Sequence, residues 1–252
     1  PGAIKGISAN GSRTTQITIN GSITCGNFLS ATTLILGNSA IVKTAKADGG
    51  SYQTFDGWWG YPGIIVDGTS YGTPGSIAMG TNTTIEFNKG GNQNINGFVP
   101  ANGTPAVGYA IPYVNLNLLG SGFKTIQSNL SVSKSLEIAS GVTMVVPSGV
   151  TLTIAAGGKI TNSGTISNAG TINFQSDATN GTATYLGAGT ISGAGTVNVN
   201  QSLQHPAGAL RSWYVSSPVA TFDPAGLSTI KYFDETLNDP TPANNWTSTT
   251  TM

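Results

Sequence analysis

The chain has 252 residues, of which 35 are glycine, and its ten Lys and Arg balance ten Asp and Glu to a formal net charge of zero. Charged residues make up 8% of the sequence, whereas an ordinary globular chain carries about 25%. A surface of this kind has no field to attract nucleic acid or an anionic membrane, so neither is expected as a partner. Disorder is not expected either, because 38% of the residues are hydrophobic and net charge is absent.

The cysteine count and the lengths of the apolar runs restrict the class of protein further. Cys25 is the only cysteine, so the chain can form neither an internal disulfide nor a multi-cysteine metal site, and no metal or cofactor is predicted. No apolar run approaches the roughly 20 residues that span a bilayer, and no membrane insertion is expected. The chain opens with Pro1-Gly2, and we interpret it as a mature or excised piece. A disulfide-free composition rich in Asn, Thr, Ser and Gly is typical of bacterial secreted surfaces and predicts an extracellular location.

Short strands are predicted because apolar residues occupy every second position. The alternation runs through residues 15–23, 83–87, 114–118 and 130–138, and it continues in the segment 150–154, where Thr alternates with Val, Leu and Ile. Glycines interrupt every window longer than about eight residues, and β-branched residues fill much of the rest. Both features disfavour helix, so the chain is predicted to be all-β.

A fixed repeat favours a parallel β-solenoid over a β-sandwich. The segment 164–173 (GTISNAGTIN) recurs as 189–198 (GTISGAGTVN), with eight identities in ten at a spacing of 25 residues. A β-sandwich would instead have longer strands joined by hairpin signals every 8–12 residues or so. We therefore predict a parallel β-solenoid (β-helix) over residues 1–203, with turns of about 18 to 25 residues that are stable only as a stack.

The alternation stops in an aromatic stretch at about 48–79, which is predicted to leave the solenoid. Six of the twenty aromatic residues gather there. Trp58, Trp59 and Tyr61 lie beside Asp56, and ring faces next to a carboxylate suit a neutral sugar, so these four residues form the candidate ligand-binding site. An alternative interpretation stays open, in which the rings cover an exposed face of the solenoid.

Two later segments also break the repeat. The proline-containing stretch 91–112 predicts a second excursion. From residue 204 the glycine repeats end, and the segments 211–219 and 231–235 have the composition of longer aromatic strands. Residues 204–252 are therefore predicted to be the start of a further β domain that is truncated.

Several segments resemble a known family. Residues 84–88 (TIEFN), 113–126 (YVNLNLLGSGFKTI) and 129–138 (NLSVSKSLEI) are similar to repeats in large surface proteins of Bacteroidetes. The stretch 211–246 resembles the region that follows such repeats in those proteins. The resemblance implies export by the type IX pathway and a role as a cell-surface adhesin, spacer or filament, with gliding motility among the functions. Its implied partners are surface glycans or other copies of the chain.

Catalysis is the competing class, because parallel β-helices also carry polysaccharide-active enzymes. Such sites need clustered acids, whereas the seven Asp and three Glu of this chain are scattered. Asp48, Asp56 and Asp67 are a set that the excursion could bring together, but aspartates in Gly-rich loops are common turn formers. We therefore predict a non-enzymatic structural or adhesive segment. The alternative is a polysaccharide-active enzyme or its carbohydrate-binding module.

Overall fold

The computed structural model shows a chain of strands and turns that falls into two compact units, Pro1–Gln204 and His205–Met252. No helix occurs among the residues that it describes. The all-β prediction is therefore confirmed for this part of the chain. The described residues are 4–8, 16–30, 33–44, 53–55, 58–60, 76–95, 97–101, 104–111, 113–203, 230–233 and 246–249.

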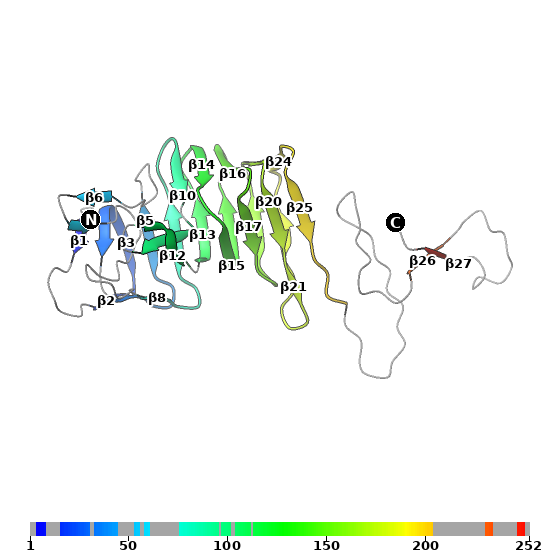
Figure 1. The fold of residues 1–252 in the computed structure, drawn as a ribbon, viewed down its shortest axis with the longest axis horizontal. Helices are drawn as coiled ribbons and strands as arrows, with labels where there is room; N and C mark the ends of the chain where they lie inside the picture. The colour runs from blue at the N-terminus through cyan, green and yellow to red at the C-terminus, as the bar shows by residue number, and fades with distance from the viewer. Residues whose placement is uncertain are drawn as a thin grey trace. The chain divides into compact units, whose positions relative to one another are not determined.

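The first unit is built around one long sheet of parallel strands (Figure 1). Its main path of hydrogen-bonded neighbours is β1 (Ile4–Ser8), β3 (Ser22–Ser30), β5 (Ile41–Thr44), β9 (Thr84–Phe87), β13 (Tyr113–Leu118), β15 (Leu130–Ile138), β17 (Thr151–Ile154), β20 (Thr171–Phe174) and β25 (Thr196–Val199). The long strand β15 pairs through its second half with β18 (Lys159–Asn162), which in turn pairs with β23 (Thr184–Leu186).

The strand register shows that the chain coils. Thr84 pairs with Asn115, Asn115 with Ser135, Ser135 with Lys159, and Lys159 with Thr184, all in parallel. Successive turns between these pairs therefore advance by 31, 20, 24 and 25 residues. The last three values lie in the predicted range, and the first turn is longer because it contains an inserted hairpin. The parallel β-solenoid predicted from the repeats is confirmed.

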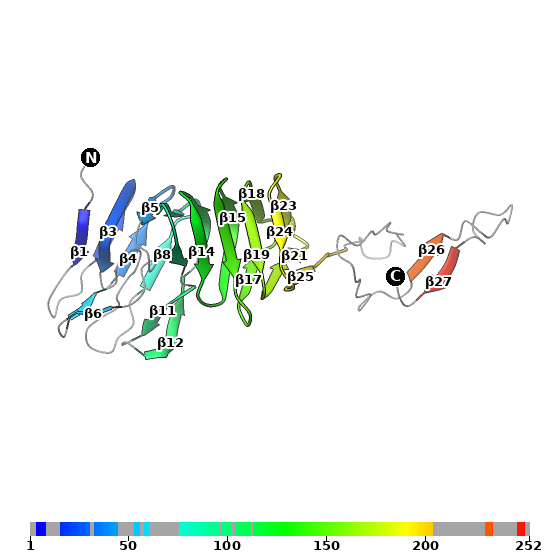
Figure 2. The same cartoon turned by 90° about the horizontal axis from the view of Figure 1, so that it is seen from above.

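In the part of the chain that the structure describes, two further parallel sheets complete the coil. One contains β2 (Gln16–Ile19), β4 (Thr33–Leu36) and β8 (Ser76–Met79), and the other contains β10 (Gln93–Ile95), β14 (Gly122–Ile126), β16 (Val142–Val146), β19 (Thr165–Asn168) and β24 (Thr190–Ser192). From β16 onward each turn supplies three strands, so this part of the solenoid has three faces. We define the first face by the first half of β15 with β17, β20 and β25, the second by the second half of β15 with β18 and β23, and the third by β14, β16, β19 and β24. Strands β17 and β25 lie on the opposite side of the solenoid from β18 and β23 (Figure 2).

The core follows the period-two alternation. In β17, Thr151 and Thr153 point outward and are half-buried, whereas the alternate residues Leu152 and Ile154 point inward and are fully buried. Equivalent apolar side chains stack from one turn to the next and remove a continuous apolar column from water, which is the main stabilising term. The inward residues at the centre of this column are Leu136, Ile138, Val142, Met144, Val146, Leu152, Ile154, Ile160, Ile166 and Ile172.

Buried asparagines occupy corners of the coil. The Asn162 side chain accepts a hydrogen bond from the Gly164 N–H (2.9 Å) and donates one to the Thr190 carbonyl oxygen (3.2 Å) in the next turn. Asn168 makes the same two bonds one corner later. Because a buried amide needs its partners, these side chains close their own corner and connect it to the next turn.

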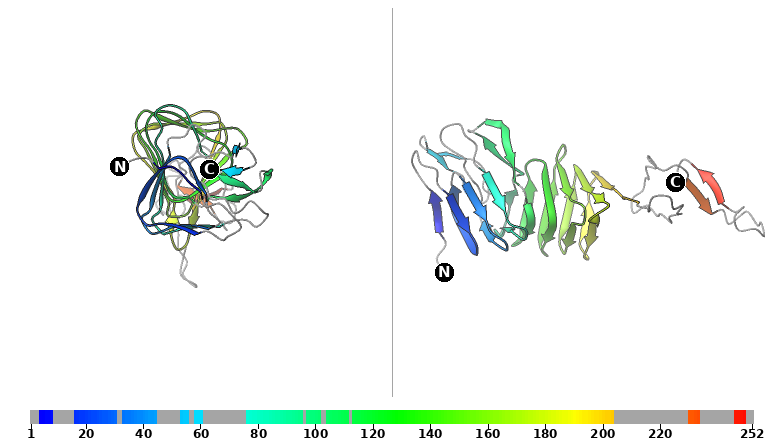
Figure 3. Two further views of the ribbon diagram at one scale, coloured as in Figure 1. Left: turned by 90° about the vertical axis from the view of Figure 1, so that its left-hand side faces the viewer. Right: turned by 90° about the horizontal axis from the view of Figure 1, so that it is seen from below.

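Within the described residues, three antiparallel hairpins leave the solenoid. They are β6 (Gln53–Phe55) with β7 (Trp58–Gly60), β11 (Phe98–Ala101) with β12 (Thr104–Ala110), and β21 (Ser176–Asp177) with β22 (Gly181–Thr182). The β11–β12 hairpin projects from the side of the solenoid (Figures 2 and 3). Strand β8 lies at the end of the range expected for the aromatic excursion, and it pairs with β4 as part of the coil.

In the second unit the structure describes one strand pair. Strands β26 (Ile230–Phe233) and β27 (Trp246–Thr249) pair antiparallel, with Phe233 opposite Trp246. Across the described parts of both units, no helix is long and apolar enough to cross a membrane.

Candidate functional site

The inserted hairpin creates a groove on the first face. The chain leaves the coil at Gly97 and returns at Ile111, whose N–H donates to the Gly97 carbonyl oxygen at 2.9 Å. Tyr113 then joins the first face opposite Val132. In this one turn the β11–β12 hairpin replaces the strand that would lie between β8 and β15. A recess therefore remains at the foot of the hairpin.

The recess is an open groove with a volume of about 750 Å³. Its polar lining consists of hydroxyl and amide side chains, and none of its described lining residues is charged. The described lining residues are Met79, Gly97, Ile111, Tyr113, Val114, Asn129, Leu130, Ser131, Ser133, Thr151 and Thr153. A concave, partly apolar surface with a few convergent polar groups is the usual form of a ligand site.

The floor of the groove is formed by buried core residues. Ile111, Tyr113 and Leu130 are 4%, 2% and 3% exposed, so they belong to the core and present only their edges. Burial raises the pKa of Tyr113 well above its usual range, so its hydroxyl stays protonated and the floor stays uncharged. The Ser133 hydroxyl donates to the Tyr113 carbonyl oxygen (3.3 Å), which fixes one wall against the floor.

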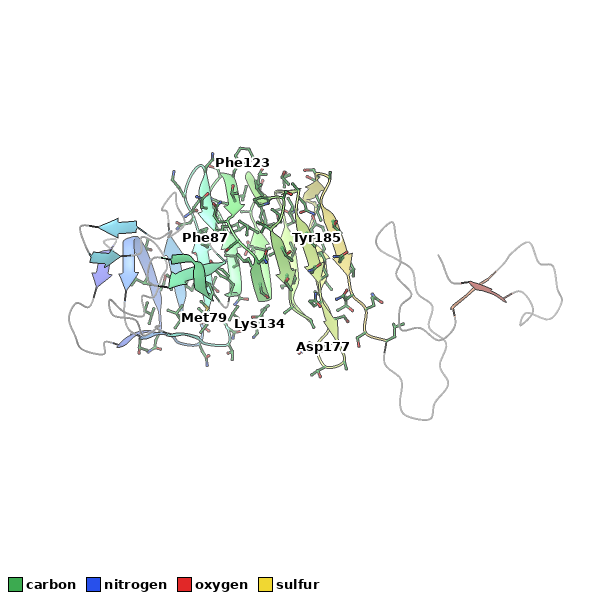
Figure 4. All side chains as sticks on the ribbon, viewed as in Figure 1. Met79, Phe87, Phe123, Lys134, Asp177 and Tyr185 are labelled. Atoms are coloured by element: carbon green, nitrogen blue, oxygen red, sulfur yellow. The ribbon has the colours of Figure 1, made fainter. Side chains whose placement is uncertain are left out.

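The charged residue next to this wall has a partner of its own. Lys134 follows Ser133 in β15, and its Nζ donates to Asn82 Oδ1 at 2.9 Å. Figure 4 shows Met79 and Lys134 at the same edge of the solenoid. Asn82 lies in the turn that follows β8, so this bond connects the two strands on either side of the replaced one.

The aromatic site predicted from the sequence is described only in part. Trp58 and Trp59 lie in β7, opposite Phe55 and Thr54 of β6. Asp56 and Tyr61 lie outside the described residues. The four residues therefore remain a predicted site, and the groove on the first face is a separate feature that the sequence did not indicate.

A buried ammonium group connects two turns at another corner. Lys124 is fully buried, and its Nζ donates to the carbonyl oxygens of Lys89 (2.7 Å) and Gly91 (3.2 Å) and to Gln93 Oε1 (3.1 Å). Burial, with repulsion from Lys89 as a smaller cause, lowers the pKa of Lys124 to about 8. All three of these contacts are to neutral oxygens at a corner, so the arrangement serves to hold the corner together.

Two of the acidic groups with described side chains have partners of their own. Glu86 forms an ion pair with Lys43 on the neighbouring strand (2.9 Å). The Asp177 carboxylate accepts hydrogen bonds from Asn180 and Thr179 in its hairpin turn, and these bonds lower its pKa. Within the described residues, no group of three or more His, Cys, Asp or Glu side chains could hold a metal ion.

Fold and site together define the class: an all-β protein with a parallel β-solenoid, a projecting hairpin and, at the hairpin's foot, a groove whose described lining residues are uncharged. No protein-family model, curated protein or solved structure matches the chain. Its function must therefore be inferred from its own residues.

Proposed function

We propose that this chain is an extracellular structural and adhesive segment of a bacterial cell-surface protein, exported by the type IX pathway, and that it is not an enzyme. The observation that carries the proposal is the parallel ladder, whose inward side chains are buried turn after turn and whose outward rows are largely Ser, Thr and Asn. Such a segment can serve as a spacer, a filament unit or an adhesin.

The structural reason lies in the direction of the hydrogen bonds. Each interior turn is bonded to the turn before it and the turn after it, so its stability comes from its neighbours. These bonds run along the axis, so each added turn lengthens the solenoid by one strand spacing, about 4.8 Å. A structure whose length grows regularly with the number of turns suits a spacer on a cell surface.

The described acids support a non-enzymatic role. Glu86 is paired with Lys43, the Asp177 carboxylate is held in its turn, and Glu137 is exposed on the second face. A glycoside-cleaving site needs two carboxyl groups within roughly 5–10 Å of each other on either side of the bond. Glu86 and Glu137 share one outward row with Asn117 between them, so their backbones lie two strand spacings, about 9.6 Å, apart. Glu86 is engaged by Lys43, so this row does not offer two unengaged carboxyl groups, and Asp177 lies in a hairpin of its own.

Location can be tested on intact cells of the bacterium that produces the protein. Antibodies raised against the solenoid should label unpermeabilised cells, and treatment with an external protease should remove the label. A strain with inactivated type IX export should lose the surface label. Labelling that appears only after permeabilisation would overturn the proposed location.

Adhesion can be tested with beads that carry the purified chain. Beads should attach to glycan-coated surfaces, and Trp58→Ala and Trp59→Ala should weaken attachment without lowering the melting temperature if the aromatic excursion is the contact surface. Unfolding of both variants would instead mean that the rings are part of the core.

An assay for polysaccharide cleavage tests the alternative that the chain is an enzyme. The chain should release no reducing ends from acidic or neutral polysaccharides. Activity that is lost in Asp56→Asn or Asp67→Asn would show that the excursion is catalytic and would overturn the proposal. Binding to glycans without turnover is consistent with adhesion and with a carbohydrate-binding module.

A further inference from the structure

The groove continues into two rows of side chains that run along the solenoid axis. Both rows lie on the first face and cross β17, β20 and β25, with the second row beginning on β15. Each member is paired in register with the next. We call them the neutral rows: Thr151, Thr171 and Thr196 form the first, and Ser131, Thr153, Asn173 and Asn198 form the second.

The groove and the rows are one surface because they share residues. Ser131, Thr151 and Thr153 line the groove and are also the first members of the rows. Two side chains of the second row bond to each other, since Asn198 Nδ2 donates to Asn173 Oδ1 at 2.9 Å. The surface therefore extends from the foot of the hairpin over three further strands.

The spacing of the rows is set by the fold. Neighbouring strands lie about 4.8 Å apart, and residues two apart on one strand are separated by about 6.6 Å. Hydroxyl and amide groups consequently recur at a constant interval along the axis. The rings of an extended linear polysaccharide also follow one another at a constant interval, so successive rings can lie over successive turns.

The charge of this surface determines whether it can bind neutral or anionic polysaccharides. All members of the neutral rows and all described groove residues are uncharged. The second face differs, because it carries the exposed residues Glu137 and Lys159. Binding an anionic chain to the neutral rows would remove its charges from water with no opposite charge to compensate.

The apolar part of the groove provides the remaining contact. Met79 and Val114 are half-buried at its wall, above the buried floor residues Ile111, Tyr113 and Leu130. The C–H faces of sugar rings pack against apolar surfaces of this kind, and the adjacent hydroxyls of Thr151 and Thr153 can bond the ring hydroxyls.

We infer that the first face binds a linear uncharged polysaccharide that lies along the solenoid axis, with one segment in the groove and the following rings over the neutral rows. This inference rests on the proposed adhesive function and names its ligand class. The groove anchors the chain by apolar contact, and the rows align it by neutral hydrogen bonds.

The test uses native gel electrophoresis of the full chain in gels that contain either hydroxyethylcellulose or carboxymethylcellulose, which share a backbone and differ in charge. A panel of dextran, galactomannan and mixed-linkage β-glucan extends the neutral arm. At least one neutral polymer should retard the chain, equally at low and high salt, and carboxymethylcellulose should not.

Variants locate the site. The double variant Thr153→Ala/Thr171→Ala should bind the retarding polymer about tenfold more weakly, as expected for the loss of two neutral hydrogen bonds. Thr165→Ala removes an equivalent half-buried hydroxyl from the third face and should bind as wild type does. Asn198→Ala, at an exposed position in the last turn, should also weaken binding and guards against a folding defect in the double variant.

Three outcomes would overturn the inference: no retardation by any neutral polymer, equal retardation by carboxymethylcellulose, or equal losses in the first-face and third-face variants. If the chain still labels intact cells and attaches to glycan-coated surfaces through Trp58 and Trp59, the proposed function stands without this site. If retardation occurs but the protein is not on the cell surface, the binding site stands and the proposed function fails.

Discussion

Asn168 and Thr196 lie 28 residues apart in the sequence and are joined in adjacent turns of the solenoid, where Asn168 Nδ2 donates to the Thr196 carbonyl oxygen at 3.1 Å. Asn168 Oδ1 accepts from the Gly170 N–H, also at 3.1 Å. The side chain is only 2% exposed, so water cannot replace these partners. One amide thus closes its own corner and holds the next turn.

Asn168→Ala should therefore lower the free energy of unfolding by about 2 kcal/mol, because it removes two hydrogen bonds at a buried corner, where the Gly170 N–H keeps only its bond to the Val146 carbonyl oxygen (3.1 Å). Asn198→Ala is the matched control, since it removes an exposed amide that bonds Asn173, and it should cost less than about 1 kcal/mol. Urea titrations of both variants measure the difference. Similar costs would show that the corner bonds do not stabilise the stack.

The glycine above this corner should be irreplaceable. Gly193 has a φ of 103°, and a Cβ at this position would collide with the carbonyl oxygen of Asn168. Gly193→Ala should lower the free energy of unfolding by about 3 kcal/mol or more. The Asn168 backbone must move away from the new Cβ, and the alanine must adopt a left-handed conformation. At Gly141, which has a φ of 78° and open space around its Cβ position, the change to Ala should cost only about 1–2 kcal/mol. Thermal melts that rank the two variants the other way would contradict this explanation.

The burial of inward side chains declines at the last described turn of the solenoid. Ile166 and Ile191 are paired in register, yet Ile166 is 0% exposed and Ile191 is 40% exposed. Ile166→Ala should cost about 2–5 kcal/mol through lost burial and the cavity it leaves. Ile191→Ala should cost about 1 kcal/mol, because its side chain is covered on one side only. Chemical denaturation compares them, and an equal loss would mean that the end of the stack is covered as fully as its centre.

The buried ammonium group of Lys124 predicts a pH dependence of stability. Its pKa is about 8 in the folded chain and 10.5 in an unfolded one, so the unfolded chain holds more protons between these values. Stability should therefore rise as the pH increases from about 8 to about 10.5.

Lys124→Met keeps the buried alkyl stem and removes the titrating group. The variant should lose stability at pH 7, because it leaves the Lys89 and Gly91 carbonyl oxygens without this donor, and it should lack the rise at alkaline pH. Unfolding free energies measured for both proteins across this range provide the test. A parallel rise in wild type and variant would assign the pH dependence to other groups.

Much of the fold could be predicted from local patterns. The alternation of Thr151, Leu152, Thr153 and Ile154 predicted which side chains are buried, because a strand presents successive residues to opposite faces whatever its neighbours are. The 25-residue repeat predicted the spacing of the later turns, because identical segments stack in register on one another. The buried asparagine corners belong to a shorter unit, since Asn162 and Asn168 are six residues apart and each stands two residues before a glycine, whereas the 25-residue repeat has Gly193 at the position of Asn168.

The candidate groove could not be predicted in the same way. Thr151 and Thr153 were recognisable as outward residues, but nothing in their own segment indicates a groove. The recess exists because the chain leaves the coil at Gly97 and returns at Ile111, which removes one strand from the first face. The aromatic stretch around Trp58 attracted attention because its composition is unusual, whereas the groove is lined by common residues.

The sequence by itself determined the all-β class, the parallel coil and the inward or outward direction of each strand residue, because these depend on a period of two and on a repeat that any reader of the chain can count. Only the tertiary structure decided where the coil is interrupted and which uncharged side chains meet there. Met79, Tyr113 and Thr153 belong to different turns, and the physical reason for their proximity is the stacking of those turns around one missing strand.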